Sequence, residues 1–512
     1  MNISDWIVRH ATFVPDKPAI RFDGRDISYR AFAQAISDIA AVLHHKLGIE
    51  RGDRVCYLGF NHPDQLALLF ACARIGAILS PLNWRLEAGE LRHLCDKLRP
   101  SAFFAQPEFL ETAREACTGR ELGNVVLGKS AGNWAGLETL VDDTASPMPD
   151  NAGYDDPALI CWTSGTTGEP KGAVLTQNAL FYNALNSQHM HDMRADDVLL
   201  NTLPMFHVGG LNVYTLPALH RGATVMFDAM FDVDATFDAI AAGAVTLLVL
   251  VPTQIVAMRE SKRWRTCDFS PLRTVTTGST LIPDSVVAAI HEKGTPIIQV
   301  YGSTETAPLA SYLMAGDSAG HASSAGKPAL HAQVRIAGDD GDDATDGVVG
   351  EVLVRGPNVM REYWEAPEAT AAALRDGWFA TGDIGHFDAD GFLHIDDRKK
   401  DMIITGGENV FPAELENLLA GVDDIREAAV VGEPDDYWGE RVVAVIVPAQ
   451  ADGLSEGDVQ ALFKGRIARY KIPRRVVFAD ALPRNAMGKV VKEEVRALVA
   501  AAPAENSPGG RP

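Results

Sequence analysis

The residues with the clearest chemical potential stand together between Thr163 and Gly172, in the sequence TSGTTGEPKG. Backbone N–H groups approach phosphate oxygens closely where side chains are absent, while hydroxyl groups and a lysine add hydrogen bonds and positive charge. The segment therefore predicts a loop that wraps a polyphosphate. Its expected binding residues are Thr163, Ser164, Gly165, Thr166, Thr167, Gly168 and Lys171.

A segment of this composition has two other interpretations. A Walker A loop needs Ser or Thr directly after its lysine, followed by a helix. Here Pro170 precedes Lys171 and Gly172 follows it, so the segment does not fit that pattern. A run of glycine and hydroxyl residues can also be a plain flexible turn.

Four further polar segments follow along the chain: Pro204–His207, Tyr301–Thr306, Thr381–Asp383 with Asp397–Asp401, and Pro483–Lys489. With the glycine-rich loop they resemble, in order and approximate spacing, the motifs of the adenylate-forming superfamily. That superfamily includes acyl-CoA synthetases, aryl-CoA ligases, adenylation domains of peptide synthetases and beetle luciferases. The resemblance extends from about residue 10 to residue 495, and bacterial fatty-acid or aryl acid CoA ligases are the most similar members.

The resemblance implies a two-step reaction. A carboxylate attacks the α-phosphate of ATP, pyrophosphate leaves, and CoA captures the acyl-adenylate. Such a displacement is catalysed mainly by positioning two anions and neutralising the charge that develops. The implied cofactors and co-substrates are ATP, Mg²⁺ and coenzyme A.

By resemblance, four residues are catalytic: Lys489, His207, Thr304 and Glu305. Lys489 would bridge the attacking carboxylate and the α-phosphate, which Thr304 would contact. Glu305 would hold Mg²⁺, an ion that prefers oxygen ligands. His207 would gate the approach of the acid.

Other residues would hold the nucleotide by resemblance. Tyr301, with Gly302 beside it, would pack on adenine, and Asp383 would accept the ribose hydroxyls with Arg398 as an added donor. Gly278, Ser279 and Thr280 stand where the family usually has Gly-Gly-Ala-Pro or Gly-Ser-Ala-Pro. This chain departs from that pattern at Thr277 and Thr280, so the family's acyl pocket is a weaker guide to the acyl pocket of this chain.

The second step would use a different face of the C-terminal region. Lys400 matches the family's pivot, Gly406 and Gly407 would lie along the pantetheine arm of CoA, and Asn409 would come near the adenylate. A cationic run follows, which either meets the CoA phosphates or is a solvated face. It consists of Lys464, Arg466, Arg469, Lys471, Arg474 and Arg475.

The acid side of the site is expected around Met205–Tyr214. These residues are aromatic, histidine, apolar or small, and none is arginine or lysine. A second substrate carboxylate would have no partner among them. The segment therefore predicts a pocket for an apolar acid with one carboxylate.

Composition excludes several classes of protein. The net charge of −22 disfavours a nucleic-acid partner. The longest apolar run, residues 239–252, is too short and interrupted to span a bilayer, and no secretory signal is evident, so we expect a cytoplasmic protein. Six scattered cysteines lack metal-site or redox spacing and are expected to be reduced and mostly buried. The sequence leaves homodimer formation open.

Short apolar runs alternate with helical patterns over the first 320 residues, which predicts α/β layers with mostly parallel sheets. From about residue 323 the chain turns rich in Gly and Asp, with short alternating strands. We expect an N-terminal AMP-binding domain over 1–397 with a β-rich subdomain over 323–397, a hinge at 398–400, a small mobile α+β domain over 401–500, and a disordered tail over 501–512.

These observations predict an AMP-forming acid–thiol ligase acting on an apolar monocarboxylic acid. A fatty acid is favoured slightly, because such substrates are common among similar sequences. An aryl acid of the hydroxycinnamate or benzoate type, or an alicyclic acid, is the alternative. A stand-alone adenylation domain that loads a carrier protein is a second alternative, and Lys489, Glu305 and Lys171 together argue against a catalytically dead ATP-binding module.

Overall fold

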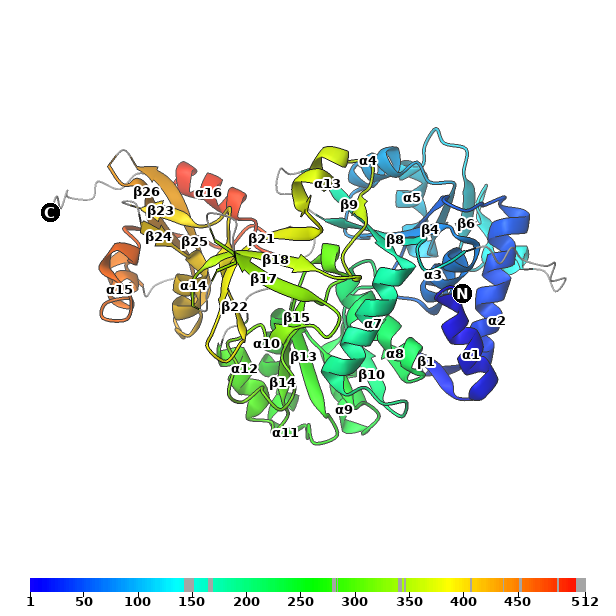
Figure 1. The fold of residues 1–512 in the computed structure, drawn as a ribbon, viewed down its shortest axis with the longest axis horizontal. Helices are drawn as coiled ribbons and strands as arrows, with labels where there is room; N and C mark the ends of the chain where they lie inside the picture. Colours follow the sequence, from blue (N-terminus) through cyan, green and yellow to red (C-terminus); the bar gives the residue numbers. More distant parts are fainter. Residues whose placement is uncertain are drawn as a thin grey trace.

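The computed structural model describes residues 1–141, 152–163, 169–278, 282, 284–338, 343–344, 347–405, 408–435, 437–450, 454–485 and 488–502. Two large sheets form the N-terminal region, and a smaller unit lies at the opposite end of the molecule (Figure 1).

The first large sheet has eight strands in the order β19-β9-β8-β4-β3-β5-β6-β7. Its central strands are parallel, whereas β8 and β9 form an antiparallel hairpin. The strands are β3 (Arg54–Leu58), β4 (Ile78–Leu82), β5 (Ala102–Ala105), β6 (Gly123–Val126), β7 (Ala135–Gly136), β8 (Pro157–Thr163), β9 (Lys171–Thr176) and β19 (Glu362–Tyr363).

The second large sheet has nine strands in the order β16-β15-β14-β13-β12-β10-β11-β1-β2, and β1 and β10–β14 are parallel. Its strands are β1 (Pro18–Phe22), β2 (Arg25–Ser28), β10 (Val198–Asn201), β11 (Thr224–Phe227), β12 (Leu247–Val249), β13 (Thr274–Gly278), β14 (Ile297–Tyr301), β15 (Ser311–Tyr312) and β16 (Lys327–Pro328).

Helices fill the space between the two sheets and cover their outer faces. The inner set comprises α1 (Ser4–Phe13), α2 (Tyr29–Ala41), η1 (Val42–Lys46), α3 (Pro63–Ile75), α7 (Gln177–His191), η3 (Gly209–Thr215) and α8 (Leu216–Arg221). The outer helices are α4 (Ala88–Leu98) and α5 (Leu110–Ala116) on the first sheet, and α9 (Val233–Ala241), α10 (Pro252–Glu260) and α12 (Asp284–His291) on the second. Short elements are η2 (Pro107–Phe109), α6 (Leu137–Leu140), α11 (Arg263–Thr266) and η4 (Thr304–Thr306).

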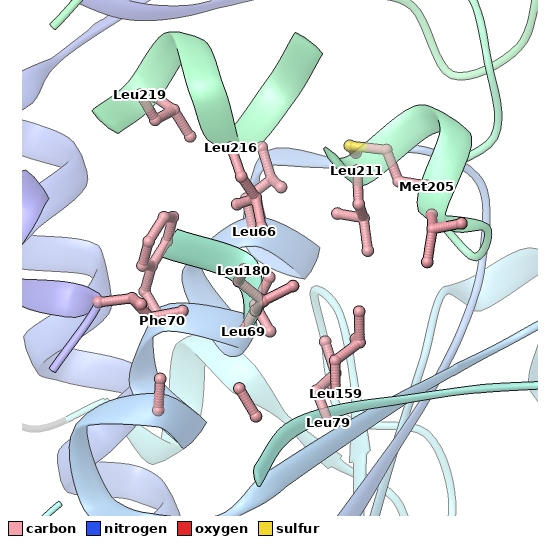
Figure 2. Close-up of a cluster of buried hydrophobic side chains, with 14 of the residues drawn as sticks. Leu66, Leu69, Phe70, Leu79, Leu159, Leu180, Met205, Leu211, Leu216 and Leu219 are labelled. Atoms are coloured by element: carbon pink, nitrogen blue, oxygen red, sulfur yellow. The ribbon is translucent and has the colours of Figure 1, made fainter. Parts of the chain in front are cut away.

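Alternation along the strands explains the layers. In β3, Val55 and Tyr57 pack into the inner core while Cys56 and Leu58 pack against the outer helices. Figure 2 shows part of the inner core, where Met205 and Leu211 lie with leucines of α3, α7 and α8. These two side chains anchor the segment that carries His207.

A β-rich subdomain follows, with β17 (Gln333–Ala337), β18 (Gly350–Arg355), α13 (Pro367–Ala373), β20 (Leu374–Arg375), β21 (Trp378–Phe387) and β22 (Leu393–Arg398). The C-terminal unit, residues 402–502, packs helices on both faces of a five-stranded sheet. Its elements are β23 (Ile403–Thr405), β24 (Glu408–Val410), α14 (Pro412–Ala420), β25 (Ile425–Asp435), β26 (Gly439–Pro448), α15 (Glu456–Ala461), η5 (Arg469–Lys471), β27 (Arg475–Phe478) and α16 (Lys492–Ala501).

The α/β layering expected from the sequence is confirmed. All six cysteines are free thiols, and only Cys267 is not buried. Among the described residues, no helix is long and apolar enough to cross a membrane. The predicted disordered tail begins too early, because Ala501 ends α16; residues 503–512 lie outside the described part of the chain.

Candidate active site

The glycine-rich loop closes the β8–β9 hairpin. Thr163 pairs with Lys171 at the loop end of the hairpin, and the Thr163 hydroxyl donates to the Lys171 carbonyl at 3.3 Å. In the second half of the loop, the Glu169 carboxylate forms an ion pair with Lys97 of α4 at 2.6 Å. The two ends of the predicted phosphate loop are therefore fixed, while residues 164–168, which include most of its predicted ligands, lie outside the described residues.

Tyr363 links this hairpin to the predicted metal carboxylate. It pairs with Ala173 through the β19–β9 ladder, and its ring lies 5.3 Å from the Lys171 Nζ. Its hydroxyl donates to Oε1 of Glu305 at 2.7 Å. Sequence analysis missed Tyr363, and the only available signal was an aromatic residue in a short segment rich in glutamate.

Glu305 lies in a buried turn directly after β14. Gly302 has a φ of +155°, and a Cβ at this position would lie 1.7 Å from the Pro308 carbonyl oxygen, so only glycine fits. Thr304 and Glu305 are 6% and 9% exposed, and the Met360 N–H donates to the Glu305 carbonyl at 2.7 Å. The turn thus holds a carboxylate in a largely dry place.

Asp383 is the centre of a second charged cluster, on β21. The Tyr301 hydroxyl donates to its Oδ2 at 2.7 Å, and Arg398 Nε lies 2.6 Å from its Oδ1. Burial raises the pKa of Asp383, and Arg398 and Tyr301 oppose that shift. Because a carboxylate has about four lone-pair positions, Asp383 keeps acceptor capacity beyond these two bonds.

Lys489 reaches these carboxylates from the C-terminal unit. It stands on a tight hairpin in which the Asn485 N–H donates to the Lys489 carbonyl at 2.9 Å and Gly488 has a φ of +78°. Although the residue retains solvent-exposed surface, desolvation lowers the pKa of its ammonium; Arg398 adds to this, whereas Asp383 and Glu305 oppose it. Charged side chains from four separate segments therefore act on one another where the C-terminal unit meets the N-terminal region, and we call this meeting place the cleft.

His207 faces the same cleft from the other side. Its Nδ1 accepts the Gly209 N–H at 3.0 Å, so the neutral ring carries its proton on Nε2. Burial, together with the charge of Lys489, lowers the pKa of His207 to about 3. A neutral N–H donor is thus fixed near the ammonium of Lys489.

A cation also lies beside this segment, in contrast to the expectation from Met205–Tyr214 alone. The Arg85 guanidinium is 5.6 Å from the Phe206 ring and 4.3 Å from the Trp84 ring. Sequence analysis could not place Arg85 here, because about 120 residues separate it from Phe206.

The roles of several other predicted site residues stay predictions. Gly278 ends β13 with its Cα against Val300, where a Cβ would lie 2.6 Å from that side chain. Asn409 lines a different cavity of about 580 Å³, and its role stays a prediction, as does the pivot at Lys400. Ser279, Thr280, Gly406 and Gly407 lie outside the described residues.

The cationic run expected to meet CoA phosphates is divided in the structure. Lys471 and Arg475 form ion pairs with Glu414 and Glu433. Arg469 and Arg474 instead line a cavity of about 600 Å³ at the surface of the C-terminal unit. These two arginines remain candidates for phosphate contacts.

The donor set fits Mg²⁺ held jointly with a nucleotide. Among the described residues, no group of three or more His, Cys, Asp or Glu could hold a metal ion. Mg²⁺ commonly uses one or two carboxylates together with substrate phosphates and water. Glu305 is a buried carboxylate of this kind, and Tyr363 fixes its orientation.

Comparisons with known proteins agree with this geometry. The model of the AMP-binding enzyme family matches residues 7–364, and that of the AMP-binding enzyme C-terminal domain matches residues 414–489. Indoleacetate–CoA ligase of Aromatoleum aromaticum is 50% identical over 98% of each chain. Feruloyl-CoA synthase of Amycolatopsis is 40% identical over 97% of this chain and 98% of its own. The o-succinylbenzoate CoA synthetase MenE of Bacillus subtilis, in complex with ATP and magnesium ion, superimposes with a TM-score of 0.85 at 28% identity over 96% of this chain and 99% of its own.

Proposed function

The chain belongs to the AMP-binding enzyme family and is an ATP-dependent CoA ligase, and we propose that its acid substrate is an aryl acid whose ring carries a hydrogen-bonding group. ATP, Mg²⁺ and CoA are its co-substrates and cofactor. The finer proposal concerns the acid alone.

The observation that carries this proposal is the side chain of Asn212. It is 1% exposed, and within the described structure neither its Nδ2 nor its Oδ1 has a hydrogen-bond partner. A buried polar group without a partner costs about 1–3 kcal/mol. An aliphatic chain could not satisfy this amide, whereas an indole N–H or a ring hydroxyl could.

The position of Asn212 fits an acyl-pocket residue. It lies five residues beyond His207 on η3, a π-helix, and such helices occur frequently at functional sites. Its carbonyl accepts from Asn183 Nδ2 at 2.7 Å, and Asn183 Oδ1 accepts the Leu309 N–H at 3.2 Å. The helix is thus tied to the chain that follows Glu305. The ring acids named for the two curated relatives support the same choice.

For the first step, we propose that Lys489 and His207 bring the substrate carboxylate and the α-phosphate of ATP together. The lowered pKa of Lys489 reflects desolvation, and each anion that enters the cleft would favour its charged form again. The Nε2–H of His207 would donate to the attacking carboxylate. Mg²⁺ held by Glu305 would neutralise phosphate charge, and Lys171 would add a cation at the loop.

For the second step, we propose that the C-terminal unit turns about Lys400 and withdraws Lys489. In the present pose, Lys489 lies with Asp383 and Glu305, whereas Asn409 lies elsewhere. This arrangement supports assigning the present pose to adenylation. A turned pose would bring the segment around Asn409 to the acyl-adenylate.

A matched pair of acids tests the substrate. Indole-3-acetate and naphthalene-1-acetate have similar fused rings, but only the first carries a ring N–H. Pyrophosphate release should favour indole-3-acetate by about tenfold in kcat/KM, the factor that corresponds to about 1.4 kcal/mol, and Asn212→Leu should abolish that preference. A decanoate kcat/KM above those of indole-3-acetate and ferulate would contradict the proposal and favour the fatty-acid prediction.

A further inference from the structure

The first turn of α14 lacks a cap of its own. Phe411 occupies the N-cap position and makes no side-chain cap hydrogen bond, and Pro412 at the next position has no N–H. The first N–H that the helix offers is therefore that of Ala413, a residue only 8% exposed. A buried N–H of this kind requires an acceptor.

The acceptor comes from the other side of the junction. Oδ2 of Asp397, on β22 of the β-rich subdomain, accepts the Ala413 N–H at 3.0 Å, while Oδ1 accepts the N–H of Arg398 at 2.6 Å. A carboxylate at a helix N-terminus is further favoured by the helix dipole. Figure 1 shows α14 beside β22 at this junction.

Besides the attraction between Lys489 and the carboxylates of Asp383 and Glu305, few interactions of the described structure hold the C-terminal unit in this pose. Apart from the turn bonds from Asp401 and Met402 to Arg398, the Asp397–Ala413 bond is the one hydrogen bond between described residues before 399 and after 401. The buried apolar clusters of the described chain each lie on one side of the junction. A cavity of about 580 Å³, lined by Trp378, Lys399 and Phe411 among others, separates the two surfaces.

From this arrangement we propose that Asp397 is a positioning residue whose bond to Ala413 holds the C-terminal unit so that Lys489 reaches the cleft, and whose release permits CoA capture. The proposal rests on the two-pose mechanism proposed above. Asp397 precedes the pivot and Ala413 follows it, so a large turn at residue 400 separates them.

The electrostatic environment of Asp397 suits a hydrogen bond to Ala413 that must also break. Burial raises the pKa of Asp397 to about 6, whereas the N–H groups of Ala413 and Arg398 and the charge of Lys492 lower it and Glu416 raises it. The ionised carboxylate of Asp397 is therefore partly removed from water where it accepts the Ala413 N–H. That desolvation opposes the hydrogen bond, which keeps the contact reversible.

Two separate assays test the proposal with the full-length enzyme and any acid that it accepts. ATP–pyrophosphate exchange measures adenylation, and addition of CoA to purified acyl-AMP measures capture. Asp397→Ala should slow adenylation by about tenfold, the size expected for a hydrogen bond to a charged group, and should leave capture within about twofold. Asp397→Asn retains a carbonyl acceptor and should keep most of the adenylation rate.

Asp396→Ala is the matched control, because Asp396 is the neighbouring carboxylate but pairs with His386 at 2.9 Å instead of α14. It should alter the ratio of the two rates by less than about twofold. If Asp397→Ala does not fold, Asp397→Ser, whose shorter side chain cannot reach Ala413, should show the same imbalance. Equal losses in both assays, or none in either, would overturn the proposal. A wild-type enzyme that exchanges pyrophosphate with no acid would instead contradict the assigned activity.

Discussion

The phosphate side and the acid side of the cleft differ in the charge of their side chains. On the phosphate side, Asp383, Arg398, Glu305 and Lys489 act on one another, and the carboxylates are held by tyrosine hydroxyls. On the acid side, His207 is neutral, the side-chain amide of Asn212 has no hydrogen-bond partner within the described part of the chain, and Arg85 lies beside Phe206. The difference supports the proposal that the reacting carboxylate of the acid lies at the boundary between the two, with the body of the acid on the side of His207 and Asn212.

The largest expected effect comes from removing the cation at this boundary. Lys489→Ala should slow adenylation by about 10²- to 10³-fold, roughly 3–4 kcal/mol, because a preorganised charge at the reacting phosphate is lost. Capture of preformed acyl-AMP by CoA should be largely unchanged. Lys129→Ala, which removes an exposed lysine of the N-terminal region, is the control. Equal losses in both steps would refute the role given to Lys489.

The next effect tests whether the acid side is truly uncharged. Burying a second ionised carboxylate without a partner costs several kcal/mol, so malonate or succinate should have a kcat/KM at least about a hundredfold below that of an apolar acid of similar size. Comparable values would show that a cation reaches the pocket. Arg85 is the candidate from its place beside Phe206, and Arg85→Gln would then remove the activity with dicarboxylates.

A smaller effect is expected from Tyr363, which only orients the carboxylate of Glu305 on the phosphate side. Tyr363→Phe keeps the ring beside Lys171 but removes the hydrogen bond to Glu305. Adenylation should slow by about tenfold, the value expected for a hydrogen bond to a charged group, and the Mg²⁺ concentration for half-maximal rate should rise. Tyr182→Phe, a tyrosine packed on His331, is the control and should leave both values unchanged.

The smallest effect concerns pH. Because the pKa of His207 is lowered to about 3, its ring stays neutral above about pH 4 and takes up a proton only in strong acid. His207→Asn should lower the adenylation rate without changing the shape of its profile between pH 6 and 8. A limb near pH 6.5 in the wild type that vanishes in the variant would show that His207 titrates during the reaction.

Local patterns in the sequence predicted much of the fold and the outline of the site. The alternation of short apolar runs with helical patterns predicted the mostly parallel sheets. Pro170 and Gly172 argued against a Walker A loop, whose lysine leads into a helix, and Lys171 instead begins β9. The family resemblance predicted Lys489, Glu305 and Asp383 as site residues, and the structure brings their charges together. Each of these inferences depends on neighbours in the chain or on a contiguous motif.

The tertiary structure alone decided the contacts that give these residues their environment. Tyr363 meets Glu305 across 58 positions, and no repeat or motif spacing in the sequence encodes that pairing. Arg85 reaches Phe206, the side-chain amide of Asn212 is buried without a hydrogen-bond partner among the described residues, and Asp397 caps a helix beyond the pivot, all through packing of distant segments. Sequence determines local conformation through periodicity and backbone restrictions, whereas burial, pKa and unpaired polar groups depend on which surfaces the fold brings into contact.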